Sequence, residues 1–225
     1  MISVDVPSVT RPEPRWPVLL AIFAAVALHF ALPTRLRVGP PWTVATIVAV
    51  LVVATQLARY RKLHNTYAVL SFSVLGVLTL GLLWGLGSLL FALKVQGKNP
   101  QNALDLLSSG GVLWATNVIV FASWYWRLDA GGPSARERRD AHTEGAFLFP
   151  QMTFSAPDNP NAPPERAGWQ PHFIDYLFVA FNTSTAFSPT DAPVLSKWAK
   201  VAMMIQAMIS FTTVVLIAAR AVNIL

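Results

Sequence analysis

The sequence predicts an all-α protein that passes through a membrane several times. Hydrophobic residues make up 54% of its 225 positions and charged residues only 12%, whereas a soluble domain carries about a quarter charged residues. Long tracts without any charged residue recur along the chain, and helices satisfy the backbone hydrogen bonds of such tracts inside a bilayer. The chain also has no cysteine, which excludes disulfides, thiolate nucleophiles and cysteine-bound metals.

Five uncharged tracts reach the length that predicts a spanning helix, which is about 20 residues for a hydrocarbon core of about 30 Å. They cover residues 16–34, 38–58, 63–93, 106–126 and 201–219. The first follows a leader with both acids and arginines and lacks a clear cleavage pattern, so we interpret it as a retained helix rather than a secretory signal.

A sixth uncharged tract, residues 176–190, is different because its apolar part ends near Phe181. Even the whole tract would cover only about 22 Å as a helix. This predicts one short helix in addition to about five spanning helices, and leaves open whether the short helix re-enters from one side or crosses a locally thinned membrane.

The chain divides into three parts by composition. Residues 1–126 form a four-helix transmembrane region, residues 127–172 a proline-rich loop, and residues 173–225 the short helix, a turn and the final transmembrane helix. Prolines make regular helix improbable over most of the loop. Its middle, GAFLFPQMTF, is apolar and aromatic, which predicts that it folds back against the helices or the membrane interface; a partly ordered loop is the alternative.

The basic excess, a net charge of +6, has a membrane explanation, because Lys and Arg accumulate in cytoplasmic loops. Placing the N-terminus inside puts most basic residues on the inner side: Arg11, Arg15, Arg59, Arg61, Lys62, Arg127, Arg136, Arg138 and Arg139. We therefore expect a multi-pass protein of the cell's inner (plasma) membrane, with the lipid bilayer as its partner and no nucleic acid.

No catalytic pattern stands out, so we expect no enzyme, no cofactor and no metal. The four histidines, His29, His64, His142 and His172, have neither HExxH spacing nor a neighbouring nucleophile elbow. A membrane-embedded enzyme would need a cluster that the linear sequence does not show, for example His172, Asp175 and Asp191 around one cavity.

Polar residues within the spans should face other helices or water, because facing lipid is costly. His29, Gln56 and Arg220 are such residues, but Gln56 and Arg220 lie near helix ends. Asn117 and Gln206 are the candidates for hydrogen bonds between helices. In the third span, Gly81 and Gly85 form a small-xxx-small pair that would let a neighbouring helix approach closely.

The stretch NTSTAFSPTD, residues 182–191, is the best functional candidate in the chain. An aromatic apolar segment precedes it and a long apolar segment follows, an order that resembles the pore helix, filter and inner helix of two-helix potassium channels. The resemblance implies a homo-oligomer that passes small cations, with pore-lining candidates Thr183, Ser184, Thr185, Ser188 and Asp191. Both filter glycines are replaced, by residues such as Ala186 and Ser188, so it implies no potassium-type filter.

A second resemblance covers more of the chain. Residues 176–225, together with WYWRLDAGG at the end of the fourth tract, look like uncharacterised bacterial integral membrane proteins, including a family known only as a domain of unknown function. That likeness implies a polytopic inner-membrane protein without a defined substrate. Besides the pore-loop channel, two alternatives stay open: a non-conducting structural or partner-binding helix bundle, and a small-solute transporter.

Overall fold

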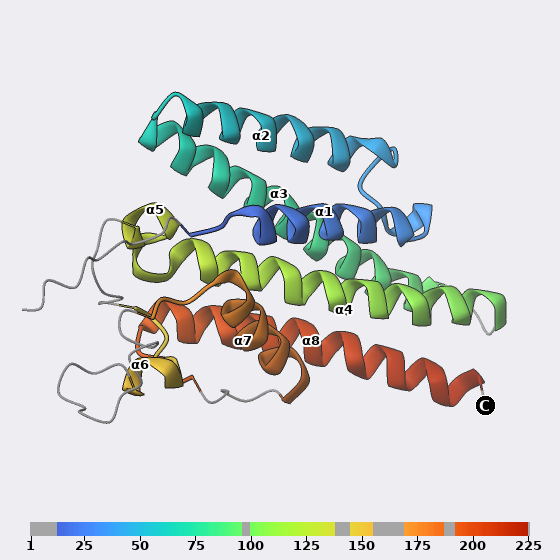
Figure 1. Cartoon of the computed structure of the whole chain (residues 1–225). Helices are drawn as coiled ribbons and strands as arrows, with labels where there is room; N and C mark the ends of the chain where they lie inside the picture. The colour runs from blue at the N-terminus through green and yellow to red at the C-terminus, as the bar shows by residue number, and fades with distance from the viewer. Residues whose placement is uncertain (1–12, 96–99, 138–144, 155–168, 187–191, 225) are drawn as a thin grey trace, which may run out of the picture.

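The computed structural model describes residues 13–95, 100–137, 145–154, 169–186 and 192–224 (Figure 1). Eight α-helices lie in these ranges: α1 Trp16–Ala31, α2 Trp42–Tyr60, α3 His64–Val95, α4 Pro100–Leu128, α5 Pro133–Arg136, α6 Pro150–Phe154, α7 Phe173–Ala186 and α8 Lys197–Ile224. Short 3-10 turns cover Thr34–Leu36 and Asp129–Gly131.

The predicted class, an all-α polytopic membrane protein, is confirmed. Four helices, α2, α3, α4 and α8, are long and apolar enough to cross a membrane. The first predicted span is shorter than expected, because α1 has 16 residues and so covers about 24 Å. It ends at Leu32, whose backbone is extended, since the following Pro33 disfavours a helical conformation in the residue before it.

Helix α4 is the centre of the bundle. It packs against α1 and α3 on one side and α7 and α8 on the other, while α2 packs against α3 at the edge (Figure 1). More than half of the apolar stretch of α4 is buried, against about a quarter in α2, α3 and α8. The outer helices therefore expose large apolar side chains, as a lipid-facing surface requires.

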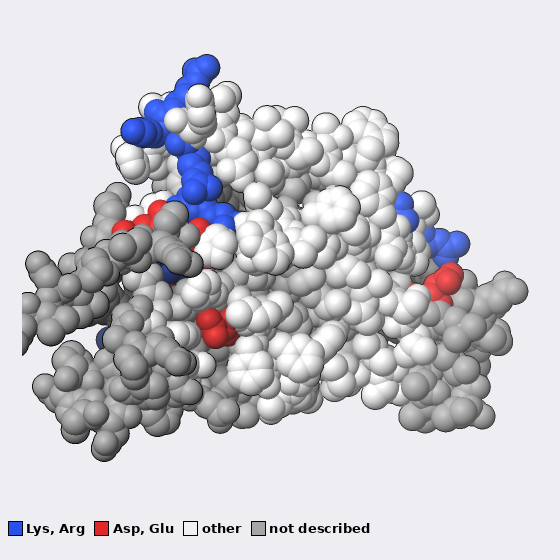
Figure 2. Space-filling model, in the orientation of Figure 1, with Lys and Arg blue, Asp and Glu red and all other residues white. Residues whose placement is uncertain are grey.

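On the face that Figure 2 shows, the charged residues of the described part of the chain lie mainly towards the two ends of the molecule. Lys and Arg gather where α2 ends and α3 begins, which includes the exposed Arg59, Arg61 and Lys62, and a smaller group lies at the opposite end. Most of this face between the two groups is formed by uncharged residues. The larger basic group marks the end of the bundle that the sequence predicts to face the cytoplasm.

The apolar segment 145–154 folds back against the helices, which confirms the prediction for this part of the loop. Ala146 and Phe147 are buried, and Phe147 pairs with Val194 in an isolated antiparallel bridge. Leu195 N–H donates to the carbonyl of Ala146 at 2.8 Å, and the amide of Ala146 donates to the Asp129 carboxylate at the end of α4. The chain just before α8 is thereby held at the same end of the bundle as the last turn of α4.

Helix α7 begins at that same end. The Tyr176 hydroxyl, in its first turn, donates to the Asp129 carboxylate at 2.6 Å, so α7 and α8 both start beside Asp129 and run in the same direction (Figure 1). After α7 the chain has therefore returned to the end from which α7 entered. This is the geometry of a re-entrant helix, one of the two alternatives that the short tract left open.

Candidate functional site

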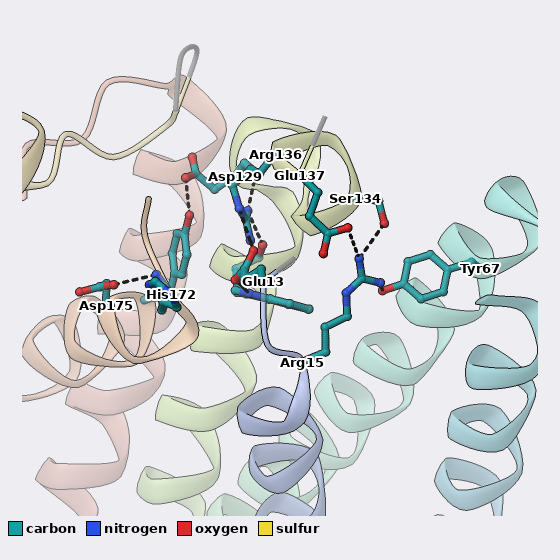
Figure 3. A network of polar contacts seen from close by, with 11 residues as sticks. Glu13, Arg15, Tyr67, Asp129, Ser134, Arg136, Glu137, His172 and Asp175 are labelled. Carbon is teal, nitrogen blue, oxygen red and sulfur yellow. Dashed lines mark hydrogen bonds and ion pairs between the residues drawn. The ribbon is translucent and has the colours of Figure 1, made fainter. Parts of the chain in front are cut away.

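Three buried arginines lie at the basic end of the bundle. Figure 3 shows Arg15 and Arg136, and Arg127 lies over the same Tyr67 ring as Arg15. Arg15 directly precedes α1, Arg127 is in the last turn of α4, and Arg136 is in α5. A cation is favourable at a helix C-terminus because the last carbonyls carry partial negative charge. Burial of three guanidinium groups nevertheless needs hydrogen-bonding partners or counter-ions.

Arg136 caps the C-terminal end of α4. One of its terminal nitrogens, Nη1, donates to the carbonyls of Trp126 and Asp129, both at 2.9 Å. The other, Nη2, pairs with Glu13 at 2.9 Å, and the same carboxylate accepts the indole N–H of Trp126. Every charge in this group is therefore compensated, and the segment before α1 is fixed to α4.

Arg15 is held between three elements. It donates to the Tyr67 hydroxyl at 2.9 Å, to the Ser134 hydroxyl at 3.2 Å and to the Glu137 carboxylate at 2.9 Å (Figure 3). The pairing is incomplete, because the buried Nε of Arg15 and the Oε1 of Glu137 have no hydrogen-bond partner. One donor of Arg15 and one acceptor of Glu137 therefore stay without a hydrogen bond among the described residues.

Arg127 differs from the other two because no carboxylate among the described residues pairs with it. Its Nε donates to the Ser71 hydroxyl at 2.8 Å, and its guanidinium carbon lies 5.6 Å and 4.6 Å from the ring centres of Tyr67 and Phe72. Within the described ranges the ion pairs join Arg15 to Glu137 and Arg136 to Glu13, and none involves Arg127. The residue is only 7% exposed, and in the described part of the chain its charge meets one hydroxyl and two aromatic faces.

The turn after α4 fixes the position of Arg127. Gly132 has a φ of +86°, and a Cβ atom there would lie 2.3 Å from Nη1 and 2.6 Å from the carbonyl oxygen of Arg127. Only glycine combines this backbone conformation with such a close approach. The sequence DAGGP therefore positions the guanidinium as well as ending the helix.

Two neighbouring cavities meet at Arg15 and Tyr67. The inner one, about 50 Å³, lies between α1, α2, α3 and α4 and is lined by Arg15, Arg127, Tyr67, Ser71 and Gln56 beside apolar side chains. That volume has room for a few water molecules or one small ion. The outer cavity, about 230 Å³, is lined by further basic residues, which include Arg59, Lys62 and His64.

The arrangement can bind an anion. Two guanidinium groups flank the inner cavity, with Arg15 and Arg127 at 5.4 Å and 5.6 Å from the same Tyr67 ring centre. Further polar groups in the lining are the hydroxyls of Thr55, Ser71 and Ser123 and the amide of Gln56. Donors in a partly apolar cavity interact strongly with an anion because the local dielectric is low.

The predicted pore-lining residues lie in different environments. Thr183 and Ser184 are buried within the chain, and the Thr183 hydroxyl donates to the Val179 carbonyl at 2.8 Å, so both are part of α7 rather than a loop after it. Thr185 is also helical but exposed. Ser188 and Asp191 lie outside the described residues, and pore lining stays a prediction for the whole group.

Asn117 and Gln206 meet across α4 and α8 in a buried network. The side-chain amide of Asn117 donates to the Gln206 carbonyl at 3.1 Å and to the Ser210 hydroxyl at 2.8 Å. The side chain of Gln206 donates to Ser184 at 2.8 Å and to the Ala180 carbonyl at 2.7 Å, and accepts from Tyr125 at 2.5 Å. Helix α7 is thus attached to the bundle by Gln206.

His172 and Asp175, two of the three residues considered for an enzymatic cluster, lie together at the N-terminal cap of α7. The backbone amide of His172 donates to the Asp175 carboxylate at 2.7 Å at the start of α7. Asp175 is the third residue of the helix, and a side chain at that position accepts from the capping residue's amide in a capping box. Burial raises the pKa of Asp175, and the amide and charge of His172 lower it by less. In the described part of the chain, no three His, Asp or Glu residues are placed to hold a metal ion.

The arginine cavity was missed at the level of sequence. Arg127 stands in WYWRLD, which is typical of a membrane interface, and Tyr67 and Ser71 carry no motif. Gln56, a polar residue within a span, was the one available signal. Comparisons of the chain with protein-family models, curated proteins and solved structures found no match.

Proposed function

We propose that this multi-pass membrane protein binds a small inorganic anion, of the size of a halide or nitrate, in the cavity between Arg15 and Arg127. The observation that carries the proposal is the buried guanidinium of Arg127, which pairs with no carboxylate of the residues that the structure describes. A buried cation without a counter-ion is strongly unfavourable, and an anion in the adjoining cavity supplies the missing charge.

The surroundings of the cavity support an anion rather than a cation. The outer cavity is rimmed by Arg59 and Lys62, so the electrostatic potential attracts anions towards the inner cavity. The inner cavity is small, which favours ions that shed most of their water. In the orientation that the basic residues predict, the anion enters from the cytoplasmic side of the plasma membrane, as in a small-solute transporter.

The proposal is tested by anion-dependent stability of the purified protein in detergent. A ligand that binds only the folded state stabilises it by about 2.7 kcal/mol at 100 times its Kd. We expect bromide and nitrate to raise the melting temperature relative to gluconate at equal ionic strength. Arg127→Gln should remove this difference, whereas Arg61→Gln, an exposed arginine at the same end, should keep it. An equal response of both variants would contradict the proposal.

A flux assay separates binding from transport. Protein reconstituted in liposomes should exchange radiolabelled chloride faster than protein-free liposomes if the cavity serves a transport cycle. Binding without flux would instead support a receptor-like or structural use of the same site.

A cation pore formed by several copies is the second candidate. The re-entrant path of α7, with exposed Thr185 near its end, favours it, since pore helices of channels enter and return on one side. Potassium flux that falls with Asp191→Ala and is absent in protein-free liposomes would support this candidate. No flux, or flux indifferent to that substitution, would contradict it.

A further inference from the structure

A large apolar groove runs along the face of α2 and α3, at the end of the bundle opposite the arginine cavity. The two helices are close where they are joined and farther apart towards the other end (Figure 1). The groove between them has a volume of about 1000 Å³. Its lining on α3 extends from Val77 to Ala92, which corresponds to about 22 Å along the helix.

Two glycines keep the groove free of side chains along α3. Gly81 and Gly87 line it, and no atom lies within 4 Å of the position that a Cβ would take at either. Gly85, in contrast, packs within the bundle, where a Cβ would lie 2.7 Å from Leu113. The two residues of the small-xxx-small pair therefore have different roles. Gly85 permits close packing inside the bundle, and Gly81 leaves open space on the outer face of α3.

The mouth of the groove carries a positive charge. Arg35 lines that end, is exposed, and forms no ion pair in the described part of the chain. The neighbouring Arg37 is engaged differently, because it donates to the carbonyls of Phe30 and Leu32 at the end of α1. Among the described residues that line the groove, Arg35 is therefore the cation available to a ligand.

We propose that the groove binds one anionic phospholipid, with an acyl chain along Gly81 and Gly87 and the phosphate at Arg35. The groove lies in a surface that faces lipid, and its length exceeds the half-thickness of the hydrocarbon core, about 15 Å, so it accommodates a chain that reaches the bilayer midplane. The positive charge at the headgroup end gives the preference for an anionic lipid. This site is independent of the proposed anion cavity.

Native mass spectrometry of the purified protein tests the proposal with phosphatidylglycerol and phosphatidylcholine of identical acyl chains. We expect phosphatidylglycerol to be retained at least about fivefold better, a difference of about 1 kcal/mol per basic residue. Arg35→Gln should abolish the preference without disturbing the fold, since Arg35 is exposed. Gly81→Leu should fill the groove and reduce retention of both lipids.

Gly76→Leu is the matched control, because Gly76 is also on α3 with open space beside it but does not line the groove. It should retain lipid like the unchanged chain. Equal retention of the two lipids, a preference that survives Arg35→Gln, or equal behaviour of the two glycine variants would overturn the proposal. So would a dimer that binds no lipid and dissociates on Gly81→Leu, since a second copy would then occupy the groove.

Discussion

Glu137 accepts a hydrogen bond from Arg15 at 2.9 Å and thereby competes for one of the two guanidinium groups beside the inner cavity. Removal of this charge by Glu137→Gln should strengthen anion binding. A partly exposed ion pair contributes up to about 1 kcal/mol, so we expect the Kd for bromide to fall by up to about fivefold. Titration of the melting temperature measures this change.

Asp105→Asn is the control for the loss of one negative charge, because Asp105 is exposed and lines a different cavity, beside Arg35. It should leave the bromide Kd unchanged. Unchanged or weaker bromide binding in Glu137→Gln would contradict competition between this carboxylate and the anion for Arg15.

Gly132→Ala should both destabilise the fold and impair the site. A Cβ at a φ of +86° is strained, and it would collide with the Arg127 side chain. We expect a loss of about 1–3 kcal/mol together with loss of stabilisation by bromide. Gly131→Ala is the matched comparison: its φ is +80°, but the Cβ would approach Ala135 instead. That variant should lose stability and keep its response to bromide; the same response in both variants would contradict a role for Gly132 in positioning Arg127.

Gln206→Leu should loosen α7. The substitution leaves the hydroxyls of Tyr125 and Ser184 without their partner, and each unsatisfied buried group costs about 1–3 kcal/mol. In this cysteine-free chain, a Ser184→Cys reporter should react slowly with a maleimide alone and much faster in combination with Gln206→Leu. Met208→Leu, on the exposed face of α8, should not change the rate. Equal rates in all three backgrounds would show that Gln206 does not hold α7.

Cysteine labelling from the two sides of the membrane tests the re-entrant course of α7. His172 and Pro193 are exposed on either side of the helix along the chain. Single cysteines there should label from the same side as Arg61→Cys, and Thr34→Cys from the opposite side. Labelling of His172→Cys and Pro193→Cys from opposite sides would establish that α7 crosses.

The sequence was sufficient to predict the four long helices α2, α3, α4 and α8, because the bilayer imposes a length on each apolar tract. It overestimated the length of α1, which has 16 residues. It identified the short tract by the same criterion, but it did not predict that helix would continue through Thr183 and Thr185 to Ala186. Threonine and serine are tolerated there because their hydroxyls donate to carbonyls of the preceding turn, as in Thr183 to Val179. The composition of NTSTA favours a loop. In the structure this stretch is helical, and its contacts with Gln206 in α8 hold it in place.

The arginine cavity could not be predicted in the same way because its walls are distant in sequence. Arg15 contacts Tyr67, 52 positions later, and Glu137, 122 positions later. Each arginine alone has the ordinary explanation of a residue at a membrane interface. The site is distinguished only by their convergence on one cavity, where the described residues supply a carboxylate for Arg15 and none for Arg127.

Anomalous diffraction from crystals grown in bromide tests the central claim most directly, because it locates the ion. We expect a bromide peak in the cavity between Arg127 and Arg15, within about 4 Å of a guanidinium nitrogen, and no such peak in Arg127→Gln. Peaks confined to exposed residues such as Arg59 and Arg61, with the inner cavity empty or filled by water, would contradict it.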